Sequence, residues 1–189
     1  FDGAGEEVST TLAVGSGTSL KVLRSIPWPH SLGHFYSTMT GFLGFTMLDG
    51  EYKLMGLAPY GAPEHLSFIR SNMLMTDKPG SYRLNPALVD YHAALQGHFA
   101  PSLRQVFGEP RKDDGAPFTH RHQQIASSTQ AAFEEVVLDL AAWAFQEGGQ
   151  QRHVAIAGGC ALNCAANGRL LREGPFEQIY VPPAPHDAG

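Results

Sequence analysis

The stretch HVAIAGGCALNCAANGRLL contains two glycines and an asparagine in an arrangement that suits a ligand-binding turn. Residues 153–157 are predicted to form a strand and residues 162–172 a helix, which puts Gly158 and Gly159 at the junction and Asn163 early in the helix. Paired glycines allow the backbone to approach a ligand closely, and free N–H groups at a helix start favour phosphate or ribose oxygens. A nucleotide would fit such a turn. The alternative is that the glycines only permit a tight connection between strand and helix.

A second glycine-rich turn, DGAGE, lies at the start of the sequence. Asp2 can offer a carboxylate to a cation while Gly3 and Gly5 bare backbone N–H groups, a combination that suits a metal-bound phosphate. Taken alone, these residues also fit an ordinary hairpin turn with a solvated acid. Asp187, in PHDAG, is equally compatible with a helix N-cap. The two acids become functional candidates only in combination with other features.

Several common active-site motifs are absent from the sequence. It contains no G-x-x-x-x-G-K-[ST] phosphate loop, no G-x-G-x-x-G fingerprint and no G-x-S-x-G nucleophile elbow. None of the nine histidines belongs to an H-E-x-x-H motif, which disfavours a zinc hydrolase. Cys160 and Cys164 are interpreted as small packing residues, because no base accompanies them in the sequence.

The composition is that of a soluble globular protein with one domain or two small lobes. The chain has 189 residues and a formal net charge of -5, and its Lys and Arg residues are scattered, which disfavours nucleic-acid binding. No apolar stretch approaches the roughly 20 residues that span a bilayer. The only two cysteines are poorly spaced for a mutual disulfide, which fits a reducing compartment. We therefore expect a cytoplasmic protein.

Two runs rich in β-branched residues near the start of the sequence predict a hairpin. They comprise residues 8–14 (VSTTLAV) and 19–26 (SLKVLRSI), with a turn at 15–17 between them. Ser31 can then cap a helix over residues 31–44, whose apolar side chains recur near the helical period.

A second helix is predicted over residues 127–147, where apolar side chains fall on one face. Ser127 and Gln130 have the S-x-x-Q spacing of a capping box at its start. The segment 62–121, which precedes it, has several prolines and no clear repeat. We interpret this segment as a mixed, partly helical insertion with short helices over residues 64–75 and 100–106.

The order of these elements predicts an α/β fold. With a further strand at residues 178–181 (QIYV), hairpin-connected strands are followed by strand–helix units, so we expect a mixed β-sheet of about five strands with helices packed on it. An acetate kinase/Hsp70/actin-like (ribonuclease H-like) lobe has the same order, although order alone does not establish that fold. Residues 1–3 have the character of a strand already under way and residues 187–189 that of a helix start, so we expect a fragment.

Four stretches of the sequence resemble the NodU/CmcH-type O-carbamoyltransferases. They are DGAGE, PHSLGHFYS, EYKLMGLAPYG and AGGCALNCAANGRLLREGPFEQIYVPPAPHDAG. Enzymes of this family modify nodulation factors, cephamycins, aminoglycosides and ansamycins. The resemblance covers both ends and most of the middle of the chain, and only residues 62–121 are weakly matched.

The resemblance implies that residues 1–189 form the second lobe of a Kae1/TsaD-like carbamoyltransferase domain. In such enzymes a C-terminal YrdC-like domain makes carbamoyl adenylate from carbamoyl phosphate and ATP, and the Kae1-like domain passes the carbamoyl group to a hydroxyl of a small molecule. An N-terminal lobe and the YrdC-like domain would therefore be needed in the full chain. We expect the fragment alone to be inactive. No covalent enzyme intermediate is required, so neither cysteine needs to be a nucleophile.

The resemblance also implies roles for individual residues. Asp2 and Asp187 match two aspartates that hold an iron-type divalent metal together with a histidine pair, which would lie upstream of Phe1. Gly158 and Gly159 match the turn that cradles the nucleotide.

Asn163 belongs to the same nucleotide turn, and Gly3 and Gly5 join the nucleotide-binding set through the DGAGE turn. Lys53 and Gly56 match a family motif near the cleft, and Lys53 is placed with the nucleotide-binding residues.

A rival hypothesis is the ATP-binding lobe of a sugar-kinase-like or Hsp70-like ATPase, which would use the same glycine turns without carbamoyl chemistry. EYKLMGLAPYG together with GGCALNCAAN favours the carbamoyltransferases. A third reading is that the isolated chain is an inactive binding module. The sequence does not identify the hydroxyl compound that would be carbamoylated.

Overall fold

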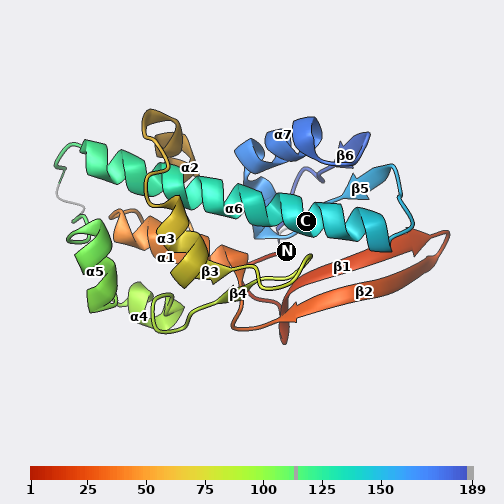
Figure 1. Ribbon diagram of the computed structural model, residues 1–189, viewed down its shortest axis with the longest axis horizontal. Coiled ribbons are helices and arrows are strands. Elements are labelled where there is room, and N and C mark those ends of the chain that lie inside the picture. The colour runs from red at the N-terminus through yellow and green to blue at the C-terminus, as the bar shows by residue number, and fades with distance from the viewer. Residues whose placement is uncertain (113–114, 187–189) are drawn as a thin grey trace. The chain divides into compact units, whose positions relative to one another are not determined.

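The computed structural model describes residues 1–112 and 115–186, and the chain divides into two compact units. Unit 1 comprises Phe1–Gly33, Thr76–Arg83 and Glu134–Gly189, and unit 2 comprises His34–Met75 and Leu84–Phe133. The elements (Figure 1) are β1 (Val8–Ser16), β2 (Ser19–Pro27), α1 (Leu32–Phe42), α2 (Glu51–Leu57), η1 (Ala58–Tyr60), α3 (Leu66–Asn72), β3 (Leu74–Met75), β4 (Arg83–Leu84), α4 (Tyr91–Leu95), α5 (Pro101–Phe107), α6 (His120–Glu147), β5 (His153–Ala155), η2 (Gly159–Leu162), α7 (Cys164–Glu173) and β6 (Gln178–Tyr180).

Unit 1 contains the two strand pairs that the sequence predicts. β1 and β2 form an antiparallel hairpin whose turn lies just beyond Ser16. β5 and β6 pair in parallel, with Val154 opposite Ile179, and η2 and α7 form the connection between them. Parallel neighbours need a crossover connection, and the helix that the spacing of residues 162–172 predicts provides it. The expectation of a mixed α/β fold is confirmed.

The expected single sheet is not found among the described residues. Their strands form three separate two-stranded sheets, with the pairs β1–β2, β3–β4 and β5–β6. β1 and β5 are not hydrogen-bonded neighbours, because a groove lined by residues of both strands separates them. The prediction of one continuous sheet is therefore wrong for this part of the chain.

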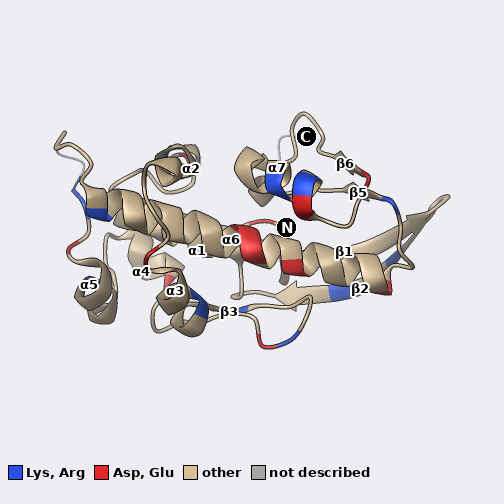
Figure 2. Cartoon of the chain, turned by 45° about the horizontal axis from the view of Figure 1, so that its top comes forward, with Lys and Arg blue, Asp and Glu red and all other residues tan. Residues whose placement is uncertain are grey.

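The second half of α6 and the helix α7 provide the helical cover of unit 1. Val136 and Leu140 of α6 are buried, as is Leu170 of α7. Arg169 of α7 links the two helices, since its Nη1 lies 3.2 Å from Glu134 Oε2 and its Nε lies 3.0 Å from Glu173 Oε2. Figure 2 shows acidic residues along α6 and both basic and acidic residues on α7. These half-buried pairs fix the orientation of α7 against α6.

The core of unit 2 forms around α1 and the first half of α6. Apolar residues of α1 recur at helical spacing, and Phe35, Met39 and Phe42 are fully buried, as the predicted helix over 31–44 requires. The hydroxyl of Tyr36 donates a hydrogen bond to Gln130 Oε1 at 2.6 Å. Among the described residues, none of the helices has both the length and the hydrophobicity that crossing a membrane requires.

The structure corrects the predicted start of α6. The helix begins at His120, about two turns before Ser127. Ser127 and Gln130 therefore lie inside the helix and do not form a capping box. The first turns are polar, and hydrophobic periodicity therefore could not reveal them. At the true start, Thr119 N donates a hydrogen bond to His122 Nδ1 at 3.1 Å.

Residues 62–121 contain the two short helices that the sequence predicts, as α3 and α5, and an additional helix, α4. They also contain the short strands β3 and β4, which pair with each other. The interpretation as a mixed insertion with two short helices therefore lacked α4 and the strand pair.

Candidate functional site

The two glycine-rich turns that the sequence singles out meet in unit 1. Asp2 Oδ1 lies 2.8 Å from the position that a Cβ atom on Gly159 would take. A Cβ on Gly158, whose φ is +95°, would overlap the backbone of Phe1. Phe1 N also donates a hydrogen bond to Ala157 O at 2.7 Å. The close approach of the DGAGE turn therefore requires glycine at position 158, whereas a Cβ on Gly159 would have to displace the Asp2 carboxylate.

Backbone N–H groups of the DGAGE turn already donate hydrogen bonds to nearby residues. Gly3 N donates to Asp2 Oδ1 at 2.6 Å, and Gly5 N donates to Val8 O at 2.9 Å. A Cβ on Gly5 would lie 2.6 Å from that same carbonyl oxygen, so the turn tolerates only glycine there. The N–H groups expected to be bare are thus engaged in this structure. A phosphate would have to replace these bonds, and the nucleotide contacts of Gly3 and Gly5 stay a prediction.

The start of α1 packs on the same turn. Ser31 Oγ donates to Asp2 O at 3.0 Å. A Cβ on Gly33 would lie 2.6 Å from the Cα of Gly3. Sequence reasoning assigned Ser31 only a capping role and gave Gly33 none. The two small residues of PHSLG, Ser31 and Gly33, are the signal that could have revealed this contact.

The buried side chain of Tyr82 connects β1 with the start of α1. Its hydroxyl lies 2.8 Å from Thr10 Oγ1 on β1 and accepts a hydrogen bond from Leu32 N at 3.3 Å. Burial raises the pKa of Tyr82 to about 12, so the phenol stays neutral and keeps its proton for these contacts. Tyr82 therefore joins β1 to the start of α1, and no pattern in the sequence predicts this contact.

Asn163 is buried at the start of α7, where its Oδ1 accepts a hydrogen bond from Ala166 N at 3.0 Å. This is the geometry of a helix N-cap. Gly158 N donates to Pro185 O at 2.6 Å, which brings the PHDAG stretch to the glycine turn. Asp187, two positions after Pro185, lies outside the described residues.

Lys53 belongs to unit 2 and is exposed on α2. Its Nζ lies 5.7 Å from the centre of the Tyr52 ring. A Cβ on Gly56 would meet no atom within 4 Å, so this glycine is not required by packing in the structure. The role of Lys53 towards a nucleotide stays a prediction.

In the described part of the site, Asp2 is the carboxylate available to a metal. Asp2 is half-buried, and no group of three or more His, Cys, Asp or Glu side chains in the described part of the chain could hold an ion. By themselves, the described residues of the site form a compact backbone turn beside the carboxylate of Asp2.

Comparison with known proteins places this site in a family. The chain matches the family described as the carbamoyltransferase N-terminus over residues 1–189. An uncharacterized protein of Synechocystis sp., sll1178, is 45% identical over 189 residues, which are 100% of this chain and 30% of that protein. The nodulation protein NolNO of Sinorhizobium fredii is 40% identical over 190 residues, covering 100% of this chain and 26% of that protein.

The nodulation protein NolO of Bradyrhizobium diazoefficiens is 38% identical over 189 residues, again 100% of this chain and 32% of that protein. The chain thus spans about a quarter to a third of the length of these curated relatives. The resemblance carried by the four sequence stretches is confirmed, because the match runs through all of them. This chain belongs to the carbamoyltransferase family and corresponds to its N-terminal region.

Proposed function

We propose that the whole protein is a cytoplasmic O-carbamoyltransferase. It makes carbamoyl adenylate from carbamoyl phosphate and ATP in a YrdC-like domain and transfers the carbamoyl group to a hydroxyl of a small molecule. The acceptor belongs to the class of nodulation factors or secondary metabolites such as antibiotics. The observation that carries the proposal is the direct contact between the DGAGE turn and the Gly158–Gly159 turn beside Asp2.

This chain contributes the nucleotide-binding lobe, with an acetate kinase/Hsp70/actin-like (ribonuclease H-like) fold. The element order supports that fold. Gly158 and Gly159 let the backbone reach the adenylate, and the DGAGE turn approaches it with Gly3 and Gly5.

Asn163 holds the start of α7 in place beside the nucleotide, through the hydrogen bond from Ala166 N. Lys53 adds a positive charge for the phosphate. Backbone N–H groups of the glycine turns orient the mixed anhydride for attack by the acceptor hydroxyl, so that transfer requires no covalent enzyme intermediate.

An iron-type metal would polarise the carbamoyl carbonyl. In the proposal Asp2 and Asp187 bind it together with a histidine pair outside this chain. The described residues do not form such a site alone, because they offer one carboxylate whose Oδ1 already accepts a hydrogen bond from Gly3 N. Oxygen ligands without imidazole also bind transition metals weakly, which agrees with the need for the histidines.

The two half-reactions of the full-length protein test the proposal. We expect Asp2→Asn and Asp187→Ala to lower formation of the carbamoylated product by at least about a hundredfold, the scale of losing one electrostatic contact in a transition state. Both variants should bind less metal but release pyrophosphate from ATP at the normal rate, because the adenylate is made in the other domain. Glu6→Gln, an exposed acid of the same turn, is the matched control. Full product formation and full metal content in both Asp variants would refute the assignment.

A further inference from the structure

Residues 29–33 of the PHSLGHFYS stretch lie in unit 1 and contact the DGAGE turn, but the proposed binding set includes none of them. The segment leads into α1, and its Ser31 is fully buried. The hydroxyl of Ser9 on β1 donates a hydrogen bond to His30 O, which holds the segment against the strand. The segment is thus fixed to β1 on one side and to the turn that contains Asp2 on the other.

Both peptide groups that flank the Cα atom of Asp2 are held by hydrogen bonds. Asp2 N donates to Ser9 O at 2.9 Å. Asp2 O accepts a hydrogen bond from Ser31 Oγ at 3.0 Å. Because Ser31 is fully buried, water does not compete for its hydroxyl. The backbone on either side determines where the Cβ atom of Asp2 lies, so these two bonds fix the direction of the acidic side chain.

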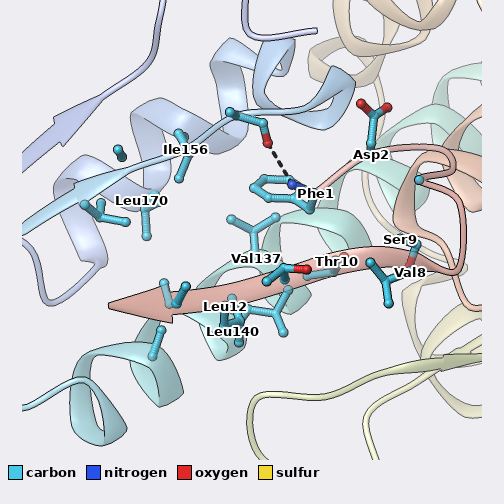
Figure 3. A pocket seen from close by; sticks show the side chains of 18 of the residues that line it. Phe1, Asp2, Val8, Ser9, Thr10, Leu12, Val137, Leu140, Ile156 and Leu170 are labelled. Atoms are coloured by element: carbon cyan, nitrogen blue, oxygen red, sulfur yellow. Dashed lines mark hydrogen bonds between the residues drawn. The ribbon is translucent and has the colours of Figure 1, made fainter. Parts of the chain in front are cut away.

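The two oxygens of the Asp2 carboxylate differ in their contacts. Oδ1 accepts a hydrogen bond from Gly3 N at 2.6 Å. Oδ2 accepts none from the part of the chain that the structure describes. Figure 3 shows the carboxylate directed away from β1, whereas the Phe1 ring lies between β1 and the segment around Ile156. Oδ2 is therefore the oxygen that Asp2 can offer to a cation.

Gly33 provides the space that the contact between Ser31 and Asp2 requires. A Cβ atom on Gly33 would lie 2.6 Å from both the Cα and the N of Gly3, and 3.0 Å from the carbonyl carbon of Asp2. These are backbone atoms, which cannot rotate away as the end of a flexible side chain can. Any larger residue at position 33 would therefore push the DGAGE turn away from the segment that holds it.

We propose that Ser31 is a positioning residue for Asp2, whose Oδ2 is the oxygen that binds the metal. The inference rests on the proposed function, in which Asp2 binds a divalent metal, and adds to it the binding oxygen and the residue that orients it. Partners that orient a metal ligand typically change metal affinity by about 10- to 100-fold when they are removed. A serine that only stabilised the fold would not affect the metal affinity of the folded protein.

Anaerobic titration of the full-length protein with Fe²⁺ tests this role. We expect Ser31→Ala to bind Fe²⁺ about 10- to 100-fold more weakly than the wild type, and Asp2→Asn to bind it at least as weakly. Ser128→Ala is the matched control. Ser128 is also fully buried and its hydroxyl donates to Gln124 O at 2.7 Å, but it belongs to unit 2. This control should keep the wild-type affinity, and urea unfolding shows whether the two serine variants lose similar stability.

Gly33→Ala tests the same support without removing a side-chain hydrogen bond. The added methyl group should displace the DGAGE turn and weaken Fe²⁺ binding. Gly168→Ala places a methyl group on another helix, where it would meet only the end of the Arg172 side chain, and should leave Fe²⁺ binding unchanged. Normal Fe²⁺ affinity in Gly33→Ala would contradict the proposed support.

The outcomes for Ser31 and Asp2 separate the inference from the function on which it rests. Wild-type affinity in Ser31→Ala beside weak binding in Asp2→Asn would overturn the role of Ser31 and leave the proposed function intact. An equal loss of affinity in Ser31→Ala and Ser128→Ala would also overturn it, because the loss would then follow stability alone. Unchanged affinity in Asp2→Asn would refute the metal-binding role of Asp2 itself, and the role of Ser31 with it.

Discussion

Asn163 shows how one side chain can serve packing and ligand binding at the same position. Its Oδ1 caps α7, and the amide is buried next to the glycine turn. Capping explains the residue without a ligand, because aspartate and serine fill the same role in other helices. The two roles can be separated, since aspartate keeps the cap but replaces the amide NH₂ with a negative charge.

We predict that Asn163→Ala lowers the free energy of unfolding by about 1 kcal/mol, the usual effect of losing an N-cap. Asn163→Asp should retain most of that stability. If the amide also contacts the nucleotide, the aspartate variant will be as stable as the wild type and bind adenylate more weakly, because its carboxylate repels phosphate. Urea unfolding and nucleotide titration of both variants distinguish the outcomes, and a stable aspartate variant with normal affinity would leave Asn163 with the cap alone.

The candidate residues could be found from the sequence to a large extent, but their contacts could not. The glycines of the Gly158–Gly159 pair and of the DGAGE turn predict places where the backbone approaches another group closely. In the structure these two turns contact each other. The sequence could not reveal that the N–H groups of Gly3 and Gly5 donate hydrogen bonds to Asp2 and Val8, because these bonds depend on local backbone geometry. Tyr82 was missed since it lies far from both turns in the sequence.

At the scale of elements, the loop between β3 and β4 is fixed to the second half of α6 by a close backbone contact. Gly80 N donates to Asp139 Oδ2 at 2.8 Å, and the φ of Gly80 is +67°. The guanidinium of Arg24 lies 3.8 Å from the centre of the Trp143 ring. A Cβ on Gly80 would overlap the Trp143 side chain, so glycine serves both conformation and space at this position.

We predict that Gly80→Ala lowers the free energy of unfolding by about 2–4 kcal/mol, since left-handed strain and overpacking act together. Gly97 is the matched control: its φ is +76°, but a Cβ there would meet nothing within 4 Å. Gly97→Ala should therefore cost only the strain, about 1–2 kcal/mol. Equal losses in the two variants, measured by urea unfolding, would show that the contact with Trp143 contributes nothing.

The start of α6 should make stability depend on pH. Burial, and then the charges of Arg121 and Arg111, lower the pKa of His122 below its ordinary value of 6.5. The folded state therefore holds fewer protons on His122 than the unfolded state does once the pH falls below about 6.5, and the stabilisation present above that pH is lost as the pH decreases. His65 contributes in the same direction, because burial lowers its pKa.

We predict that the urea midpoint of the wild type falls between pH 7 and pH 5, and that His122→Gln falls less over the same interval. The remaining slope in the variant would come largely from His65. A variant whose pH dependence equals that of the wild type would show that His122 does not titrate with folding.

The elements show which sequence signals are robust. The strand-like runs of residues 8–14 and 19–26 predict the hairpin that is observed, because β-branched residues and the glycine turn between them favour it strongly. The start of α6 was predicted too late, since the polar turn from His120 onwards has no apolar stripe. The pairing of β3 with β4 also escaped prediction, because two-residue strands carry no periodicity.

At the scale of the whole molecule, the predicted sheet and the described strands differ for one physical reason. The strand pairs of unit 1 are separated by a groove whose edges present backbone groups from both sides. Element order predicts which strands lie in this chain, but it does not predict which of them are hydrogen-bonded neighbours. The metal-binding role of Asp187 also stays a prediction. The structure places Pro185 at the glycine turn, but Asp187 lies outside the described residues.

The central claim is that the turn at Gly158–Gly159 and the DGAGE turn together bind the adenylate in a carbamoyltransferase. Calorimetric titration of the full-length protein with a stable analogue of carbamoyl adenylate tests it most directly. We predict two binding events per wild-type chain, one in each nucleotide-using domain, and only one in Gly159→Val, because a valine side chain would displace Asp2 and fill the approach to the ligand. Gly168→Ala, whose Cβ would meet only the end of the Arg172 side chain, should keep both events. A correctly folded Gly159→Val protein with both events at unchanged affinity would contradict the account.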